Sequence, residues 1–211
     1  MFDYLLNALV TLLVTVDPLG LAPVFVVLTT GMAGSARRQT AIRASTVAAG
    51  VLIAFALIGE PLLGFLGISQ AAFRISGGLL LFVIAFEMVF GLRMQRKTSQ
   101  AHDAANREDN SHIAVFPLAI PLISGPGAIS ATILLASRAP SIWATILLLV
   151  IIVLMVGACL AVFLVANRAE RLLGETGRIV VSRLLGLLLA ALSVQFVADG
   201  IMVFVHGNGL P

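Results

Sequence analysis

The sequence predicts an all-α integral membrane protein with six transmembrane helices, arranged as two inverted repeats of three helices. Hydrophobic residues make up 60% of the 211 residues and charged residues only 11%, and the mean hydropathy is +1.09. Such values exclude an ordinary soluble domain. The apolar runs are about 20 residues long or longer, which is the length of a membrane helix. They do not alternate polar and apolar residues as the strands of a membrane barrel do.

Six apolar runs are long enough to cross a bilayer. They are residues 4–30, 44–63, 73–90, 113–137, 142–165 and 184–205. The polar segment 93–112 separates the third run from the fourth, and we expect it to be a flexible cytoplasmic linker between repeats 1–92 and 113–211. The first run lacks a preceding basic region and exceeds the apolar core of a signal peptide, so we expect it to remain in the mature protein.

The basic residues predict the topology. If the runs alternate in direction, Arg74 and Arg138 fall on one side of the membrane and eleven basic residues fall on the other. The eleven are Arg37, Arg38, Arg43, Arg93, Arg96, Lys97, Arg107, Arg168, Arg171, Arg178 and Arg183. Because cytoplasmic loops carry the excess of Lys and Arg, both termini are expected outside. This distribution explains the high pI at a net charge of only +3, and we expect no nucleic-acid partner.

Two signals indicate an internal duplication. Pro18 and Pro126 lie 108 positions apart, each in the middle of a long apolar run. The segments RISG at 74–77 and RLLG at 183–186 correspond at a nearly equal offset of 109. Because each half has an odd number of crossings, the second half enters from the opposite side and the repeat is inverted. This architecture is common in secondary transporters, which bind substrate at mid-membrane between the repeats.

Proline and glycine interrupt the first and fourth runs. Pro18 has no N–H and clashes with the preceding turn, whereas Asp17 and Pro18 suit the N-cap and first position of a new helix. The segment PLISGPG at 121–127 repeats this pattern, with Ser124 or Gly125 as the N-cap of a helix beginning at Pro126. Both helices 1 and 4 are therefore predicted to break at mid-membrane.

The breaks define the candidate binding site. A helix start carries unpaired N–H groups and partial positive charge, which bind an anion such as a carboxylate. The first break adds an anionic side chain, and the second adds a hydroxyl and glycines that allow close approach. A zwitterion matches this asymmetry. The predicted substrate-binding residues are Asp17, Pro18, Gly20, Ser124, Gly125, Pro126 and Gly127. The structural alternative is that the kinks and the Asp cap are purely architectural.

Other polar residues are secondary candidates. Asp17 is a candidate proton carrier because ionisable groups deep in a membrane are usually functional. Glu87 is a second coupling candidate, with interfacial pairing to Arg93 as the alternative. Glu60 and Arg74 are expected to close a short outer loop. The remaining candidates, for which helix packing is the alternative, are Gln195, Thr15, Ser130 and Thr132.

At the broken helices the sequence resembles the MarC family of bacterial and archaeal membrane proteins. The resemblance rests on VDPLG at 16–20 with Pro23, GIS at 67–69, FRISGG at 73–78 and PLAIPLISGPGAI at 117–129. Asp17 stands where the family often has Asn. The resemblance implies a six-span protein of the cytoplasmic (inner) membrane and a carrier of small neutral amino acids. The inverted repeat predicts alternating access, with one repeat rocking against the other around the site at the broken helices.

Competing functions are an enzyme, a channel and a non-transporting scaffold. His102, His112 and His206 lie in loops or at the tail, and the sequence has neither an HExxH motif nor an acidic cluster. We therefore expect no catalytic, cofactor or metal site. The single cysteine, Cys159, is expected to pack in the core. A channel or an exporter of another small solute would use the same broken helices, and a scaffold would need neither Asp17 nor Ser124.

Overall fold

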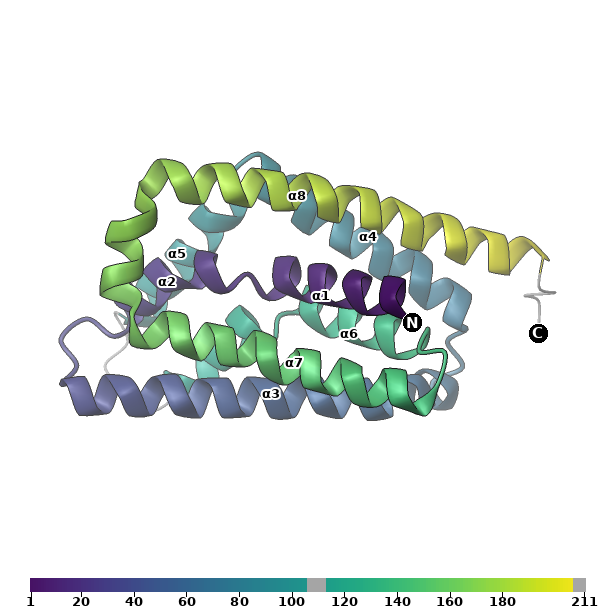
Figure 1. Ribbon diagram of the computed structural model, residues 1–211, viewed down its shortest axis with the longest axis horizontal. Helices are drawn as coiled ribbons and strands as arrows, with labels where there is room; N and C mark the ends of the chain where they lie inside the picture. The colour runs from purple at the N-terminus through teal and green to yellow at the C-terminus, as the bar shows by residue number, and fades with distance from the viewer. Residues whose placement is uncertain (106–112, 207–211) are drawn as a thin grey trace.

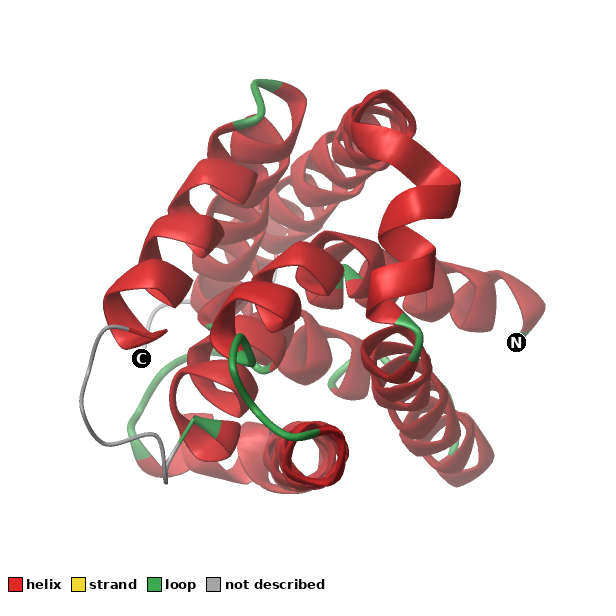
Figure 2. Ribbon diagram, turned by 90° about the vertical axis from the view of Figure 1, so that its left-hand side faces the viewer, coloured by secondary structure: helices red, strands yellow, loops and turns green. Residues whose placement is uncertain are grey.

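The computed structural model describes residues 1–105 and 113–206, except for the side chains of residues 101–105, 167–175, 178 and 206. Over this part of the chain the fold is helical and contains no strand (Figure 2). The helices are α1 (Phe2–Val16), α2 (Pro18–Leu28), α3 (Gly34–Phe65), α4 (Gln70–Val89), α5 (Leu92–Ala105), η2 (Ala114–Ile123), α6 (Pro126–Ala136), α7 (Ile142–Leu164) and α8 (Ala166–His206). The predicted all-α class is confirmed.

The predicted spans correspond to these helices. Five segments are long and apolar enough to cross a membrane, and η2 with α6 forms a sixth that is bent by 57°. The five are Phe2–Leu28, Gly34–Phe65, Gln70–Val89, Ile142–Leu164 and Ile179–Val205. The chain is therefore a multi-pass membrane protein, and its first and fourth spans are the broken ones.

The first span lies at the centre of the bundle. In its most apolar window 67% of the residues are buried, against 22–33% in the corresponding windows of spans Gly34–Phe65, Gln70–Val89, Ile142–Leu164 and Ile179–Val205. The outer helices instead expose large apolar side chains such as Phe82, Val153 and Leu187. In a bilayer these side chains face lipid, whereas the break in the first span is surrounded by protein.

Helices from the two halves pack against one another in pairs. In Figure 1, α4 lies along α8 and α3 lies along α7. The α4–α8 contact is close because Gly78 and Gly200 lack side chains: a Cβ on Gly78 would lie 2.9 Å from the Ser193 carbonyl oxygen. The N-terminus and the end of α8 lie toward the same end of the molecule (Figure 1). The inverted symmetry of the two halves stays a prediction.

The segment expected to be a flexible linker is largely helical. Residues 92–105 form α5, which packs against α2, and Arg93 and Lys97 are buried. The expectation of a flexible linker is wrong for this part, because α5 places two cations in the protein interior. Residues 106–112 lie outside the described residues, as does His112, and so do the side chains of His102 and His206.

Candidate functional site

The first break is centred on Asp17. This residue has φ 56° and ψ 65°, a left-handed conformation that ends α1, and its N–H donates to the carbonyl of Leu13. Its carboxylate Oδ1 accepts the N–H of Gly20 at 3.0 Å, and Pro18 takes the first position of α2. The predicted N-cap and restart are confirmed. A Cβ on Gly20 would collide with the Asp17 carboxylate, so this position requires glycine.

The first half of the fourth span is irregular. Phe116 and Ile120 have extended backbone conformations, and each precedes a proline. A following proline disfavours helical conformation at the residue before it, and it supplies no N–H itself. The segment therefore advances through wide turns, in which the N–H of Ser124 donates to the carbonyl of Ala119. The second break thus joins an irregular segment to the regular helix α6.

At the second break, Gly125 is the N-cap of α6 and Pro126 is its first residue. The predicted restart is confirmed, and of the two alternatives for the cap, Gly125 is correct. No side chain caps this helix, whereas Asp17 caps α2. The N–H groups of Gly127 and Ala128 belong to the first turn, which has no preceding helical carbonyls to accept them. They form a concentration of hydrogen-bond donors at the second break.

The Ser124 hydroxyl is not one of these hydrogen-bond donors facing the break. Its hydroxyl donates to the carbonyl of Ala48 on α3 at 3.1 Å, and the residue is 1% exposed. The Ser124 side chain therefore hydrogen-bonds the second break to α3. The next three residues, 125–127, line the cavity that is described below.

Arg93 of α5 binds the end of α1. Its Nη2 donates to the Thr15 carbonyl at 2.5 Å and its Nη1 to the Val14 carbonyl at 3.3 Å. These carbonyls lack helical partners because α1 ends at Val16. A cation at a helix C-terminus also complements the negative end of the helix dipole. Arg93 therefore stabilises the broken end of α1.

Lys97, one turn further along α5, pairs with Asp17. Its Nζ lies 3.3 Å from Asp17 Oδ2, and the two side chains are only 7% and 10% exposed. Lys97 is the only lysine in the chain. Charges at such depth require partners, and this pair neutralises both.

The environment of α5 lowers the pKa of both cations. Burial lowers the pKa of Lys97 to about 8, with the nearby charge of Arg93 acting in the same direction and the Asp17 carboxylate opposing it. Burial likewise lowers the pKa of Arg93. Lys97 is therefore much closer to neutrality at physiological pH than an exposed lysine, whose pKa is about 10.4.

A cavity of about 270 Å³ connects these cations with the second break. Arg93 and Lys97 line one side of it, and Gly125, Pro126 and Gly127 line another. The cavity is polar where the cations and the start of α6 meet. It therefore presents ammonium, guanidinium and backbone N–H donors to one shared space.

Glycine is needed on the α6 side of this cavity. A Cβ on Gly127 would collide with Ile84 Cδ1, and a Cβ on Gly125 would lie 2.6 Å from the Pro121 carbonyl oxygen. Both contacts are with the protein's own atoms, so packing already requires glycine at these positions, and close approach of a ligand stays a prediction. Arg93 and Lys97 therefore lie near both breaks. They contact the first break directly, and they face the second break across the cavity.

Neither Glu87 nor Glu60 lines this cavity, although Arg96, the partner of Glu87, does. Glu87 pairs with Arg96 at 2.6 Å, so its interfacial partner is Arg96 rather than Arg93. Glu60 accepts a hydrogen bond from Gln70 instead of pairing with Arg74. Glu87 therefore has an ion-pair partner, as the alternative expected, and its coupling role stays a prediction.

At the opposite end of the bundle a third ion pair joins α8 to the segment that follows α6. Arg138 donates to Asp199 at 2.6 Å, and Gln195 donates to the other carboxylate oxygen at 2.7 Å. The Arg138 guanidinium also lies over the ring of Phe196, 4.5 Å from its centroid. Gln195 therefore supports this ion pair rather than a cavity at the helix breaks.

The hydroxyl candidates are mostly occupied within their own helices. Thr15 donates to the Thr11 carbonyl and Thr132 to the Ala128 carbonyl, which is ordinary packing chemistry in membrane helices. Ser130 is half-buried. Of the three, only Thr15 lines the cavity. Cys159 is fully buried, as expected.

Sequence reasoning missed Arg93 and Lys97 because their surroundings have the composition of a linker. One signal pointed to them: a carboxylate at mid-membrane requires a cation, and the chain offers one lysine. Their spacing of four residues places both on one face of a helix.

The comparisons with known proteins cover nearly the whole chain. A family model described as MarC family integral membrane protein matches residues 2–205. A UPF0056 membrane protein of Buchnera aphidicola subsp. Acyrthosiphon pisum is 36% identical over 91% of this chain and 89% of its own length. The UPF0056 membrane protein YhcE of Escherichia coli is 37% identical over 88% of this chain and 86% of its own.

The similarity extends to archaea. A UPF0056 membrane protein of Methanocaldococcus jannaschii is 35% identical over 94% of this chain and 96% of its own length. No solved structure matches the chain. Since both the family model and these relatives span almost the full sequence, the chain belongs to the MarC family of integral membrane proteins.

Proposed function

We propose that the protein is a secondary transporter of small neutral amino acids, which binds the zwitterion between the two helix breaks. The observation that carries the proposal is the buried Asp17–Lys97 ion pair beside a cavity. An amino acid carries the same two charges as this pair. Its ammonium suits Asp17, and its carboxylate suits Lys97, Arg93 and the uncapped start of α6.

Charge balance favours a zwitterion over a singly charged solute. Separating Lys97 from Asp17 leaves two uncompensated buried charges, which is strongly unfavourable. A zwitterion inserted between them gives each a new partner, whereas a carboxylic acid without an ammonium leaves Asp17 unpaired. The site should therefore select for both charges of the substrate.

The size of the cavity favours a small substrate. Pockets for drug-sized ligands measure about 300–1,000 Å³, and this cavity measures about 270 Å³. Ile84 and Leu80 supply apolar lining, which suits a short side chain. Glycine, alanine and serine are the substrates of choice.

Alternating access fits the placement of the contacts. Arg93 and Lys97 connect α5 to the first break, while Arg138 and Asp199 connect α6 to α8 at the other end of the bundle. We propose that these contacts close opposite ends of the pathway, with one repeat rocking against the other. The uneven distribution of basic residues supports a cytoplasmic-membrane orientation with both termini outside.

The test is counterflow of labelled alanine into proteoliposomes preloaded with unlabelled glycine, alanine or serine. Wild type should show saturable exchange, and Asp17→Asn and Lys97→Met should abolish it. Two exposed residues provide matched controls: Asp3→Asn on the same span as Asp17, and Arg43→Gln for Lys97. Both controls should retain exchange.

The outcomes separate the competing functions. Flux that does not saturate and exceeds carrier rates would indicate a channel. Absence of exchange of all three amino acids by folded wild-type protein would contradict the proposal. If exchange survives both Asp17→Asn and Lys97→Met, the protein is still a transporter, but its substrate does not bind at the Asp17–Lys97 ion pair.

A further inference from the structure

A second cavity with charged groups of both signs lies where the end of α4, the start of α5 and α8 meet. We call it the α8 cavity. Its volume is about 300 Å³, close to the 270 Å³ of the cavity at the helix breaks. Its polar lining residues are Glu87 of α4, Arg93 and Gln95 of α5, and Ser182 and Arg183 of α8. The lining therefore combines a carboxylate with two guanidinium groups, a hydroxyl and an amide.

The α8 cavity shares a wall with the cavity at the helix breaks. Arg93 lines both cavities. The Glu87–Arg96 ion pair also connects them, because Glu87 lines the α8 cavity and Arg96 lines the other. A solute in the α8 cavity would therefore lie next to the proposed substrate site.

Two charged groups of the α8 cavity have unused binding capacity. Glu87 pairs with Arg96 through Oε1 at 2.6 Å, but its Oε2 is buried and has no hydrogen-bond donor among the described residues. A buried carboxylate oxygen without a donor is unfavourable. Arg183 is exposed and takes part in none of the ion pairs between described residues. The cavity thus offers an acceptor for an ammonium and a guanidinium for a carboxylate.

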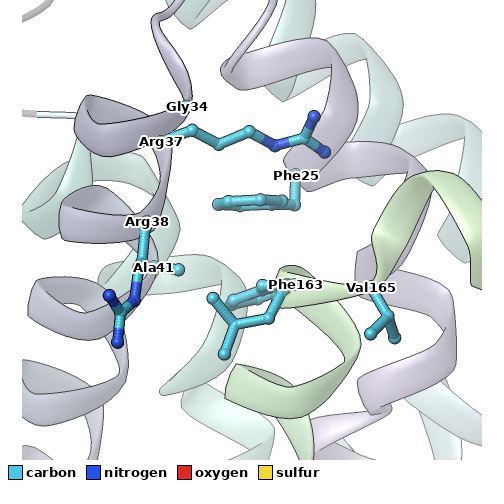
Figure 3. Close-up of a pocket in the computed structure, with 8 residues that line it drawn as sticks. Phe25, Gly34, Arg37, Arg38, Ala41, Phe163 and Val165 are labelled. Carbon is cyan, nitrogen blue, oxygen red and sulfur yellow. The ribbon is translucent and has the colours of Figure 1, made fainter.

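The cavity where α2, the start of α3 and the end of α7 meet lacks this combination (Figure 3). It is larger, at about 410 Å³, and it is bordered by the stacked rings of Phe25 and Phe163, whose centroids are 4.5 Å apart. Among the described residues that line it, none is acidic. A zwitterion would find no carboxylate there for its ammonium, so the α8 cavity suits it better.

We propose that the α8 cavity is a second binding site for the transported zwitterion, with the carboxylate of the substrate at Arg183 and Ser182 and its ammonium at Glu87. This site rests on the function proposed above, since it takes the same substrate. The ammonium supplies the donor that Glu87 Oε2 lacks, once the Glu87 carboxylate turns toward it. Arg93 and Arg183 belong to the basic residues that predict the cytoplasmic side. The substrate therefore occupies the α8 cavity between the cytoplasm and the site at the helix breaks.

The test is equilibrium binding of labelled alanine to the purified full-length protein in a neutral detergent. Wild type should bind two equivalents per chain. A double variant, Asp17→Asn with Lys97→Met, removes both charges of the first site and should bind one equivalent. Arg183→Gln added to this double variant should weaken the remaining binding at least tenfold, because it removes a charge-assisted hydrogen bond.

Glu87→Gln gives a second test in the same double variant. It keeps the size of the side chain but removes the charge that the ammonium would contact, so it should also weaken the remaining binding. Arg43→Gln, an exposed control that does not line the α8 cavity, should bind as its parent does.

The outcomes distinguish this site from the proposed function. If wild type binds one equivalent and the double variant binds none, the second site is overturned and the proposed function stands. Remaining binding that neither Arg183→Gln nor Glu87→Gln weakens would likewise overturn the second site. If folded wild type binds no alanine, both proposals fail.

Discussion

The ammonium of Lys97 lies 3.3 Å from the carboxylate of Asp17, and both side chains are buried. The contact joins residues 80 positions apart, and it connects α5 to the point where the first span breaks. Arg93 strengthens the same junction by binding the last carbonyls of α1. We expect the stability of this junction to depend on charge balance.

Removing one charge of the pair should cost more than removing both. Lys97→Met leaves the Asp17 carboxylate unpaired, and loss of one partner of a buried ion pair costs about 3–5 kcal/mol. Asp17→Asn keeps an oxygen for the Gly20 N–H, so its effect isolates the charge. The double variant should be more stable than either single variant, as measured by unfolding in mixed micelles. Additive losses would contradict a direct interaction.

Lys97 should make stability rise with pH between about 8 and 10.5. Its pKa is about 8 in the folded protein and 10.5 as the ordinary value, so the unfolded chain binds more protons in this window. The free energy of unfolding then increases with pH through this window. The penalty for burying the charged ammonium is fully present below pH 8.

The measurement is the difference in free energy of unfolding between wild type and Lys97→Met across pH 7 to 10.5. Because Lys97 is the only lysine, its acylation can be followed apart from that of the N-terminal amine by peptide mass spectrometry, and the pH dependence at Lys97 provides a second measure of its pKa. A difference that stays flat across the window would contradict the assignment.

The cavity wall at Gly127 should not tolerate a methyl group. Gly127→Ala places a Cβ against Ile84, so we expect at least a tenfold loss of exchange, equivalent to about 1.4 kcal/mol. Ile84→Ala in the same chain should restore part of it. Gly157→Ala, on α7, meets nothing within 4 Å and should leave exchange unchanged. Full exchange activity of Gly127→Ala would show that the substrate does not pass along the cavity wall at Gly127.

Ser124 should be structural rather than substrate-binding. Ser124→Ala removes the hydrogen bond to the Ala48 carbonyl, and the expected loss of stability is about 1 kcal/mol. The apparent affinity for alanine in counterflow should change by less than about threefold, because the hydroxyl is directed at α3. A large loss of affinity at unchanged stability would contradict this role.

Local chemistry made most of the fold and both helix breaks predictable from the sequence. Proline and aspartate act on their own turn of helix, so the cap at Asp17 and the restart at Pro126 followed from neighbouring residues. Apolar runs likewise identified the spans. Even the irregular segment η2 has a local cause, since Pro117 and Pro121 each force the preceding residue into extended conformation.

The polar partners were not predictable, because they depend on contacts between distant segments. Arg93 and Lys97 lie in a segment whose composition is that of an exposed linker, yet packing against α2 buries them. The direction of the Ser124 hydroxyl depends on α3, which lies 76 residues away in the chain. The binding site predicted from the two helix breaks alone therefore did not include Arg93 and Lys97.

The most direct test of the account is competition in counterflow of labelled alanine by unlabelled alanine, alaninamide and propionate. Alaninamide lacks the carboxylate that Lys97 and Arg93 would bind, and propionate lacks the ammonium that Asp17 would bind. We predict that alanine competes and that neither analogue does at a hundredfold excess, equivalent to about 2.7 kcal/mol. Competition by propionate as strong as that by alanine would show that the substrate ammonium makes no favourable contact with Asp17. That result would contradict a zwitterion bound between Asp17 and Lys97.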